Sequence, residues 1–392
     1  MSGAFGSDRA RPETGGGGGA AGGLRSGAAG GRAGHPAFEG ASGPTVPDRG
    51  AARPTAGRPG AAPSTSHRSG AATLATVIAV LGPTGVGKTG VAVELARLLG
   101  TRVISCDSMQ VYRDFPVLTN QPSTEEGRAA FHALVGVIDP VRNCTAAEYA
   151  ALAQPLIEED LARVGRALIV GGTGLYMRAA LAPLAVAACV DEEVRAGLEE
   201  RARVEGPEVL HAELARLDPA AALAIDPRNT RRLVRALEAV SAGGRAWSGR
   251  DDLWSPAYRH PTVIVGLVVE RKELYRRINA RAVRMVEGGA VEEVRRFREG
   301  RGEVGTRPGG PGIRSAIGYP EICRYLDGLQ SRRETIDQIA GATRRYARRQ
   351  LTWLRKVGDA VIIDVHDREA RDIAREIAAL AVGTPPDKES HH

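Results

Sequence analysis

A short glycine-rich segment near residue 85 holds the residue types best suited to phosphate chemistry. It reads G-x-x-x-x-G-K-T and lies between an apolar run and a helical pattern. Backbone N–H groups of such a loop curl around a phosphate, and the start of the helix adds favourable partial charge. The lysine bridges phosphate oxygens and the threonine hydroxyl suits Mg²⁺. We therefore predict a phosphate-binding loop (P-loop) made of Gly82, Pro83, Thr84, Gly85, Val86, Gly87, Lys88 and Thr89.

A P-loop predicts a phosphate-bearing ligand but leaves the reaction open. GTPases read their base with N-K-x-D, and the sequence contains no such motif. A small-molecule or nucleoside kinase and a transferase that releases diphosphate both remain open at this point. A third class, an RNA-binding protein with a regulatory P-loop, would bind without turnover.

A carboxylate follows the second apolar run, in Ser105-Cys106-Asp107-Ser108-Met109-Gln110. If that run is a strand, Asp107 lies at the carboxyl edge of a sheet, close to the P-loop. There it can bind Mg²⁺, act as a general base or cap the next helix. The residue types alone do not choose among these three roles.

The elements that would position these residues are β-branched runs alternating with helical patterns. Such alternation is typical of an α/β fold, and we predict a P-loop NTPase-like parallel sheet core. One helix is expected at 146–164, and two or three helices are expected after the fourth strand. The strands are expected at 76–81, 103–105, 167–170, 262–269 and 361–365.

Composition divides the chain further. Residues 1–72 hold 19 of the 49 glycines and few large apolar side chains, which predicts a disordered N-terminal tail. This tail is either dispensable or an arm that tethers nucleic acid. Residues 190–255 read as helices only, which indicates an all-helical insert between two parts of the core, 73–189 and 256–368. Residues 369–392 are expected to form a helix end and a polar tail.

Charge and cysteines limit the possible classes. The 392 residues carry a net charge of +7, which permits a nucleic-acid partner. Four cysteines without a C-x-x-C pair exclude a ligand-paired zinc site and argue against a disulfide framework, so we expect a cytoplasmic protein. No apolar run reaches the roughly 18 residues of a membrane span.

Residues 344–356 predict a helix with a basic stripe. At about 100° per residue, the cations fall within about 140° and the apolar residues occupy the other side. No acid lies in this segment, which favours a polyanion as the partner over a mixed solvent-exposed face. The cations are Arg344, Arg345, Arg348, Arg349, Arg355 and Lys356, and the apolar residues are Tyr346, Ala347, Leu351, Trp353 and Leu354.

The order of motifs along the chain resembles the tRNA dimethylallyltransferase (tRNA isopentenyltransferase) family. The resemblance covers about residues 76–356. After the P-loop, the matching segments are DSMQVYR at 107–113, GGTGLY at 171–176, NTRRLVRALE at 229–238, GIRSAIGY at 312–319 and TRRYARRQLTWLR at 343–355.

This resemblance implies a prenyl transfer. A dimethylallyl group would pass from dimethylallyl diphosphate to the exocyclic N6 amine of the adenosine immediately 3′ of the anticodon. The substrates would be tRNAs that read codons beginning with U, bound through the anticodon stem-loop. Diphosphate would leave with the assistance of Mg²⁺. We expect the enzyme to act as a monomer.

The resemblance also implies residue roles. Asp107 would accept the proton of the amine, and Thr89 would lie near the leaving diphosphate and Mg²⁺. Arg281 borders a predicted apolar stripe with Leu274 and Ile278, so it either snorkels over the core or contacts that diphosphate.

The expected tRNA-binding residues come from several motifs. Taken alone, Thr173 is a turn residue and Arg195 a solvated helix charge, and Gln110 is expected to hydrogen-bond a base edge. The full set is Asp107, Ser108, Met109, Gln110, Thr173, Arg195, Arg231, Arg232, Arg235, Arg314, Arg345, Arg348 and Arg349.

Three departures from the family pattern weaken the expected binding of tRNA. Gln121 stands where a lysine is usual, and Pro320 replaces a basic residue. The usual pair of histidines is reduced to His132-Ala133. None of these changes touches the P-loop or Asp107.

Overall fold

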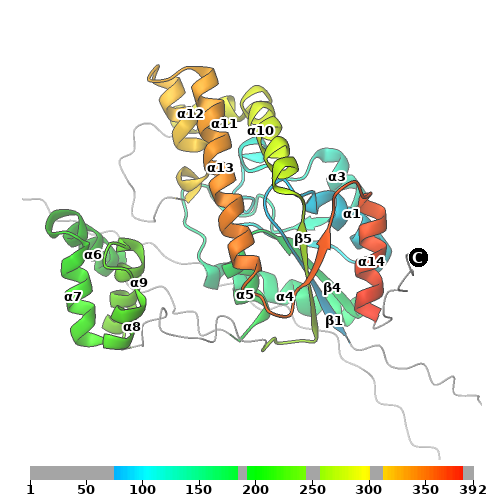
Figure 1. Ribbon diagram of the computed structural model, residues 1–392, viewed down its shortest axis with the longest axis horizontal. Helices are drawn as coiled ribbons and strands as arrows, with labels where there is room; N and C mark the ends of the chain where they lie inside the picture. The colour runs from blue at the N-terminus through cyan, green and yellow to red at the C-terminus, as the bar shows by residue number, and fades with distance from the viewer. Residues whose placement is uncertain (1–74, 184–191, 244–256, 301–311, 383–392) are drawn as a thin grey trace, which may run out of the picture. The chain divides into compact units, whose positions relative to one another are not determined.

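Five of the six strands lie where the apolar runs predict them. A computed structural model describes residues 75–183, 192–243, 257–300 and 312–382 (Figure 1). The predictions for residues 1–72 and for the polar tail fall outside these ranges. The strands are β1 (Thr76–Leu81), β2 (Val103–Cys106), β3 (His132–Ala133), β4 (Arg166–Gly171), β5 (Thr262–Val268) and β6 (Val361–Asp364). The two-residue β3 was not predicted, because it is too short to show a period.

All pairings in the sheet are parallel, in the order β3-β2-β4-β1-β5-β6. This confirms the predicted parallel α/β core. The order places β4 between β1, which precedes the P-loop, and β2, which precedes Asp107. The turns that follow these three strands therefore meet at one edge of the sheet.

The two faces of the sheet bury two apolar clusters. Along β1, Val77, Ala79 and Leu81 belong to one cluster, and Ile78 and Val80 belong to the other. This alternation is the two-residue period of a strand that is covered on both faces. The core is therefore a three-layer arrangement of helices, sheet and helices.

The longest helix of the first core segment, the fourth in order, begins and ends at clear signals. It starts at a capping box of Thr145 and Glu148 and ends at Gly165, whose φ is 69°. Its bounds agree with the prediction of 146–164. The helices of the first core segment are α1 (Lys88–Leu99), α2 (Pro116–Thr119), α3 (Thr124–Ala129), α4 (Ala146–Val164) and α5 (Gly174–Leu181).

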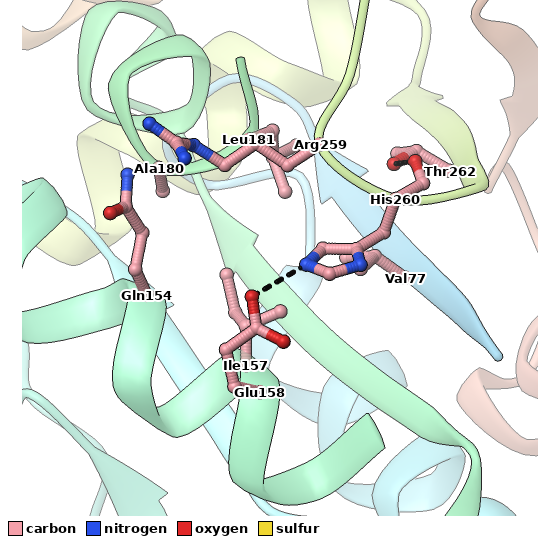
Figure 2. A pocket seen from close by; sticks show the side chains of 9 residues that line it. All are labelled: Val77, Gln154, Ile157, Glu158, Ala180, Leu181, Arg259, His260 and Thr262. Atoms are coloured by element: carbon pink, nitrogen blue, oxygen red, sulfur yellow. Dashed lines mark hydrogen bonds and ion pairs between the residues drawn. The ribbon is translucent and has the colours of Figure 1, made fainter. Parts of the chain in front are cut away.

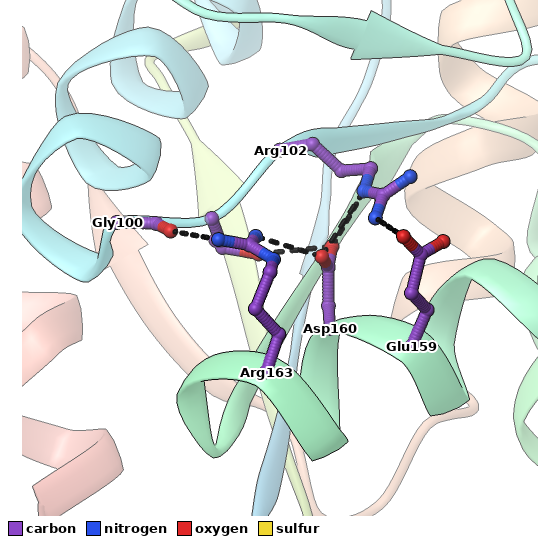
Figure 3. Close-up of polar contacts among 6 residues, drawn as sticks. Gly100, Arg102, Glu159, Asp160 and Arg163 are labelled. Carbon is purple, nitrogen blue, oxygen red and sulfur yellow. Dashed lines mark hydrogen bonds and ion pairs between the residues drawn. The ribbon is translucent and has the colours of Figure 1, made fainter.

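A buried carboxylate fixes α4 to the amino end of β2 (Figure 3). Asp160 is fully buried, and its oxygens accept hydrogen bonds from Arg102 Nε at 3.0 Å, Arg163 Nη2 at 2.9 Å and Thr101 Oγ1 at 3.0 Å. Arg102 also pairs with Glu159. Three donors compensate the cost of burying the charge.

The helical insert has an apolar cluster of its own. Its buried residues, among them Leu210, Leu214, Leu233 and Leu237, all come from within the segment 198–237. The described part of the insert holds helices and no strand, as predicted, and its shortest helix begins at Pro219. They are α6 (Glu192–Glu205), α7 (Pro207–Leu217), α8 (Pro219–Ala224) and α9 (Thr230–Ser241).

The second core segment holds more helix than predicted. Four α-helices and a 3₁₀ helix are described between β5 and β6, where two or three were expected. The predicted C-terminal helix end is a whole helix, α14, that packs against α1. These elements are α10 (Arg271–Glu287), α11 (Ala290–Glu299), η3 (Gly312–Ser315), α12 (Tyr319–Leu326), α13 (Arg332–Leu354) and α14 (Ala370–Val382).

Two further findings concern membrane-spanning helices and the state of the cysteines. In the part of the chain that the structure describes, no helix is long and apolar enough to cross a membrane. Cys106, Cys144 and Cys323 are free thiols. Cys189, the fourth cysteine, lies outside the described ranges.

Candidate active site

The predicted P-loop connects β1 to α1. Gly85 and Gly87 have φ angles of 85° and 107°, which glycine adopts without strain. Lys88 folds back over the loop, where its Nζ donates to the carbonyls of Gly82 at 2.9 Å and Pro83 at 3.0 Å. Burial lowers the pKa of Lys88 to about 8, although Asp107 nearby acts in the opposite direction. The loop thus holds a desolvated amine with a negative group nearby.

Asp107 follows β2 and takes one of its three predicted roles, that of a cap. Its Oδ1 accepts hydrogen bonds from the backbone N–H of Met109 at 2.9 Å and of Gln110 at 3.4 Å, so it caps the next turn. No hydrogen bond to its Oδ2 is found among the described residues. One oxygen therefore positions the carboxylate while the other stays available for chemistry.

The turn after β4 lies between the P-loop, which follows β1, and Asp107, which follows β2. Thr173 Oγ1 accepts a hydrogen bond from Ser108 N at 3.0 Å, and Thr173 N donates to Cys106 O. A Cβ atom on Gly171 would lie 1.8 Å from Cys106 O, so only glycine fits there. Thr173 is therefore more than a turn residue, because it fixes the segment that follows Asp107.

Helix α10 brings Arg281 onto the P-loop. Its Nη1 donates to Thr84 Oγ1 at 2.7 Å, and its Nε is buried without a hydrogen-bond partner. Burial lowers the pKa of Arg281, and Asp107 opposes that shift. A snorkelling arginine would keep its head group in solvent. That alternative is wrong here, because the guanidinium points into the site.

Sequence reasoning missed three side chains of this site. Arg277, one turn before Arg281, donates from Nη1 to Val86 O at 3.1 Å. Gln350 accepts a hydrogen bond from Thr84 N at 2.8 Å. Burial and the Asp107 carboxylate raise the pKa of Tyr346, whose hydroxyl lies by Thr173. A polar residue amid the apolar face of a basic helix was the available signal for Gln350.

The basic stripe on α13 is largely as predicted. Arg345, Arg348 and Arg349 are exposed, while Ala347 and Leu354 are buried. The helix ends at Leu354, so Arg355 and Lys356 lie beyond its last turn.

Arg344, a member of the predicted stripe, is only partly exposed to solvent. Arg344 is half-buried, donates to Asn279 Oδ1 and lies 5.9 Å from the ring of Tyr275. Packing against α10 withdraws it from the stripe.

The arginines of the insert divide into two groups. Arg231 and Arg232 are exposed on α9 and make no ion pair among the described residues. Arg235 and Arg195 both pair with Glu238, whose side chain is 2% exposed. Arg195 is itself only 14% exposed, so the description as a solvated helix charge is wrong.

Gln110, an expected tRNA contact, and Gln121, which replaces a usual lysine, are both engaged within the protein. Gln110 accepts from Ser105 Oγ at 3.0 Å and donates to Asn120 O, so its amide stabilises the loop rather than facing outward. Gln121 donates to Tyr112 O at 2.7 Å and Gln110 O at 3.2 Å, which is a structural use for the residue that replaces the usual lysine.

The remaining expected tRNA contacts are accessible. Arg314 in η3 is exposed, and Ser108 and Met109 are half-buried beside Asp107. These positions therefore allow a contact with a macromolecule.

A small cavity lies at the opposite edge of the sheet (Figure 2). Its lining includes Val77 and Thr262, which stand at the amino ends of β1 and β5, and the ion pair of His260 with Glu158 at 2.7 Å. It is therefore separate from the P-loop edge.

The site suits a divalent cation whose coordination shell is completed by the substrate. No group of three or more Asp, Glu, His or Cys side chains capable of holding a metal is found in the described ranges. Thr89 offers a hydroxyl at the start of α1. Mg²⁺ commonly binds through one or two protein oxygens, waters and substrate phosphates, and Thr89 fits that arrangement.

Comparison with known proteins gives the family. The IPP transferase family model matches residues 110–357, and an isopentenyl transferase model matches residues 75–130. A tRNA dimethylallyltransferase of Thermomicrobium roseum is 43% identical over 290 residues, 74% of this chain and 86% of that protein. The chain belongs to the IPP transferase family. A tRNA dimethylallyltransferase of Geobacter sulfurreducens is 42% identical over 281 residues, which are 71% of this chain and 89% of that protein.

Solved structures of the IPP transferase family share the fold. The tRNA isopentenylpyrophosphate transferase of Bacillus halodurans aligns with a TM-score of 0.57 and 36% identity, over 79% of this chain and 97% of that protein. A eukaryotic dimethylallyltransferase acting on tRNA aligns with a TM-score of 0.66. At 24% identity, that likeness concerns the fold alone. Membership of the IPP transferase family disfavours the kinase alternative.

Proposed function

We propose that this protein transfers a dimethylallyl group from dimethylallyl diphosphate to a tRNA. The acceptor is the exocyclic N6 amine of the adenosine immediately 3′ of the anticodon, in tRNAs that read codons beginning with U. The observation that carries this proposal is the partner-free oxygen of Asp107 beside two half-buried cations, Lys88 and Arg281. Because the substrate is tRNA, we place the enzyme in the cytoplasm. Its monomeric state stays a prediction.

The P-loop side of the site would hold the leaving group. Loop N–H groups and Lys88 bind the diphosphate, and Arg281 reaches it from α10. These donors stabilise the negative charge that grows on the departing oxygen, and such preorganised groups often contribute the largest share of rate enhancement. Thr89 would hold Mg²⁺ together with the diphosphate oxygens, and the ion would neutralise diphosphate charge when it is bound.

The Asp107 side of the site would activate the acceptor. The lone pair of an exocyclic amine is delocalised into the adenine ring, so the amine is a weak nucleophile. As the nitrogen–carbon bond forms and the carbon–oxygen bond to diphosphate breaks, Oδ2 of Asp107 accepts the amine proton. A positioned base of this kind typically contributes about 10²–10⁴-fold to the rate.

The acceptor base must leave its stack to reach this site. Enzymes that modify a base extrude it into a pocket, and RNA readers prefer unstacked loop bases. Ser108, Met109 and Thr173 lie beside Asp107 and would border the extruded adenine. Arg345, Arg348 and Arg349 on α13, with Arg314, would contact the phosphate backbone. Arg231, Arg232 and Arg235 would supply the insert's contribution, while Arg195 would hold the Glu238 that orients Arg235.

The deciding assay supplies unmodified tRNA with either dimethylallyl diphosphate or ATP. Prenylated tRNA and released diphosphate with the first donor are the expected result. A phosphorylated product with ATP would instead support a kinase. Binding of tRNA without any product would support an RNA-binding protein with a regulatory P-loop.

A further inference from the structure

One turn of α13 carries exposed cations on one side and a buried amide on the other. Arg348 and Arg349 are exposed, while Gln350, the next residue, is 7% exposed. A glutamine is rarely buried unless its amide is hydrogen-bonded, because an unpaired buried amide is costly. The partners of Gln350 are therefore informative.

Both ends of the Gln350 amide are used, and each reaches a different segment. Oε1 accepts a hydrogen bond from Thr84 N, within the P-loop, at 2.8 Å. Nε2 donates to Gly172 O, in the turn after β4, at 3.0 Å. These contacts span 266 and 178 residues of sequence. The side chain thus connects the basic helix to the loop that would hold the diphosphate.

The turn after β4 is shaped to admit this helix. A Cβ atom on Gly172 would lie 2.1 Å from Gln350 Nε2, and one on Gly174 would lie 2.0 Å from Trp353. Real Cβ atoms do not approach other atoms so closely. The two glycines are therefore needed where α13 packs, and this close packing holds the Gln350 amide in place.

Thr84 is held from two helices. Its backbone N–H is bonded to Gln350 of α13, and its side-chain oxygen accepts from Arg281 of α10. Without Gln350, Thr84 would lose the anchor of its backbone and keep only the side-chain contact. The loop would then pay an ordering cost when the diphosphate binds, because flexible backbone must be fixed at that moment.

We propose that Gln350 is a positioning residue that holds the P-loop ready for the prenyl diphosphate, although it lies within the helix expected to bind tRNA. The inference rests on the proposed function for the identity of the donor. Its consequence is a separation of effects within one helical turn. Loss of Gln350 weakens binding of the diphosphate, whereas loss of the neighbouring arginines weakens binding of tRNA.

The test compares Gln350→Met, which keeps the length but removes both hydrogen bonds, with the wild-type full chain. Calorimetry measures the Kd of inorganic diphosphate with Mg²⁺, and steady-state kinetics measures the KM of dimethylallyl diphosphate. Because the substitution leaves the Thr84 N–H unpaired, the Kd of diphosphate and the KM of dimethylallyl diphosphate should each rise about tenfold. The Kd of tRNA should stay within about twofold of wild type, because tRNA phosphates contact the other side of the helix.

Two further variants serve as controls. Thr352→Ala changes an exposed residue of the same turn, whose hydroxyl donates to Arg348 O within the helix, and should leave the Kd of diphosphate and the KM of dimethylallyl diphosphate unchanged. If Gln350→Met fails to fold, as judged by thermal melting, Gln350→Asn replaces it. That amide remains polar but is one methylene too short to reach both partners.

The outcomes separate the two proposals. Unchanged diphosphate binding in the Gln350 variants, or an equal loss for diphosphate and tRNA, would overturn the positioning role. Weaker diphosphate binding with normal tRNA binding supports it, whatever the product assay shows. Failure of the wild type to prenylate tRNA would count against the proposed function alone, because the calorimetric comparison needs no turnover.

Discussion

Asp107 divides its two oxygens between the fold and the chemistry. Oδ1 caps the turn through the N–H groups of Met109 and Gln110, and Oδ2 accepts no hydrogen bond from the described residues. A cap and a base are usually treated as alternatives for such a residue. Here the cap aims the carboxylate, so the base does not need to be ordered when the substrate arrives.

Asp107→Asn should separate these two tasks. The amide oxygen can still cap the turn, but the side chain no longer accepts a proton. We expect single-turnover prenylation to fall about 10²–10⁴-fold, with folding and tRNA binding retained. Rapid-quench measurement with radiolabelled donor and filter binding of tRNA test this. A wild-type rate would remove Asp107 from the role of base.

Lys88 gives donor binding a pH dependence. Its pKa is about 8 in the ligand-free protein, and a bound diphosphate favours the charged amine, which raises that pKa. Below about pH 8 the amine is already charged, so affinity for dimethylallyl diphosphate should be constant. Above that pH the affinity should fall by up to about tenfold per pH unit.

Calorimetry without tRNA measures this dependence, because no turnover occurs. Lys88→Arg is the matched control, since arginine stays charged over the whole range and should show no alkaline decline. A wild-type Kd that is constant from neutral to alkaline pH would contradict the assignment of Lys88 to the diphosphate.

At the scale of elements, α13 has to serve two surfaces at once. Its apolar face and Gln350 pack onto the core, while Arg345, Arg348 and Arg349 face outward. Like charges on one face repel, so such a stripe is stabilised when it meets a polyanion. The sequence period alone predicted this division of the helix, apart from the buried amide.

Arg348→Gln combined with Arg349→Gln should weaken tRNA binding and reduce its dependence on salt. Each lost phosphate contact should remove about one unit from the slope of log K against log salt concentration. Filter binding over a salt series provides the measurement. The control pair is Arg371→Gln with Arg375→Gln, which removes the same charge from α14. An unchanged slope in the α13 variant would exclude that helix from the tRNA interface.

Helix α4 depends on one buried charge. Asp160 holds Arg102, Arg163 and Thr101 at the amino end of β2. Asp160→Ala should lower the free energy of unfolding by about 3–5 kcal/mol, because both arginines lose their buried partner. Glu159→Gln, at an exposed position, should cost less than about 1 kcal/mol.

Urea denaturation of the two variants provides the comparison. Turnover well below the melting temperature should be unchanged in Asp160→Ala, since the cluster lies at the edge of the sheet opposite the P-loop. Equal stability of the two variants would mean that the buried cluster contributes little.

At the scale of the whole molecule, the core and the helical insert carry different ligand groups. All the groups assigned to the diphosphate belong to the core. The insert has a hydrophobic cluster of its own and contributes only arginines such as Arg231 and Arg232. Its described part can therefore respond to tRNA without responding to the donor.

Hydrogen exchange tests this division. Dimethylallyl diphosphate at about a hundred times its Kd should stabilise the P-loop and α1 by about 2.7 kcal/mol. Exchange in α6 to α9 should not change, whereas tRNA should slow exchange in both the core and α9. Slower exchange in α9 with the donor alone would contradict the division.

The sequence by itself determined the chemistry and most of the elements. Five strands, the P-loop and the carboxylate after β2 follow from local patterns, because a strand period, a glycine turn and a strand end are properties of consecutive residues. The ordered motifs then indicated the family. The short elements β3, α2, α3 and α8 were not predicted, since none of them is long enough to show a period.

Only the tertiary structure decided what meets at the site. The sheet order inserts β4 between β1 and β2, so Thr173 reaches Ser108 and Gly172 reaches Gln350. Arg195 is engaged within the protein because α6 packs against α9, which carries its partner Glu238. These hydrogen bonds join residues that are 43, 65 and 178 positions apart, so they depend on packing in three dimensions, and no local pattern in the chain encodes them.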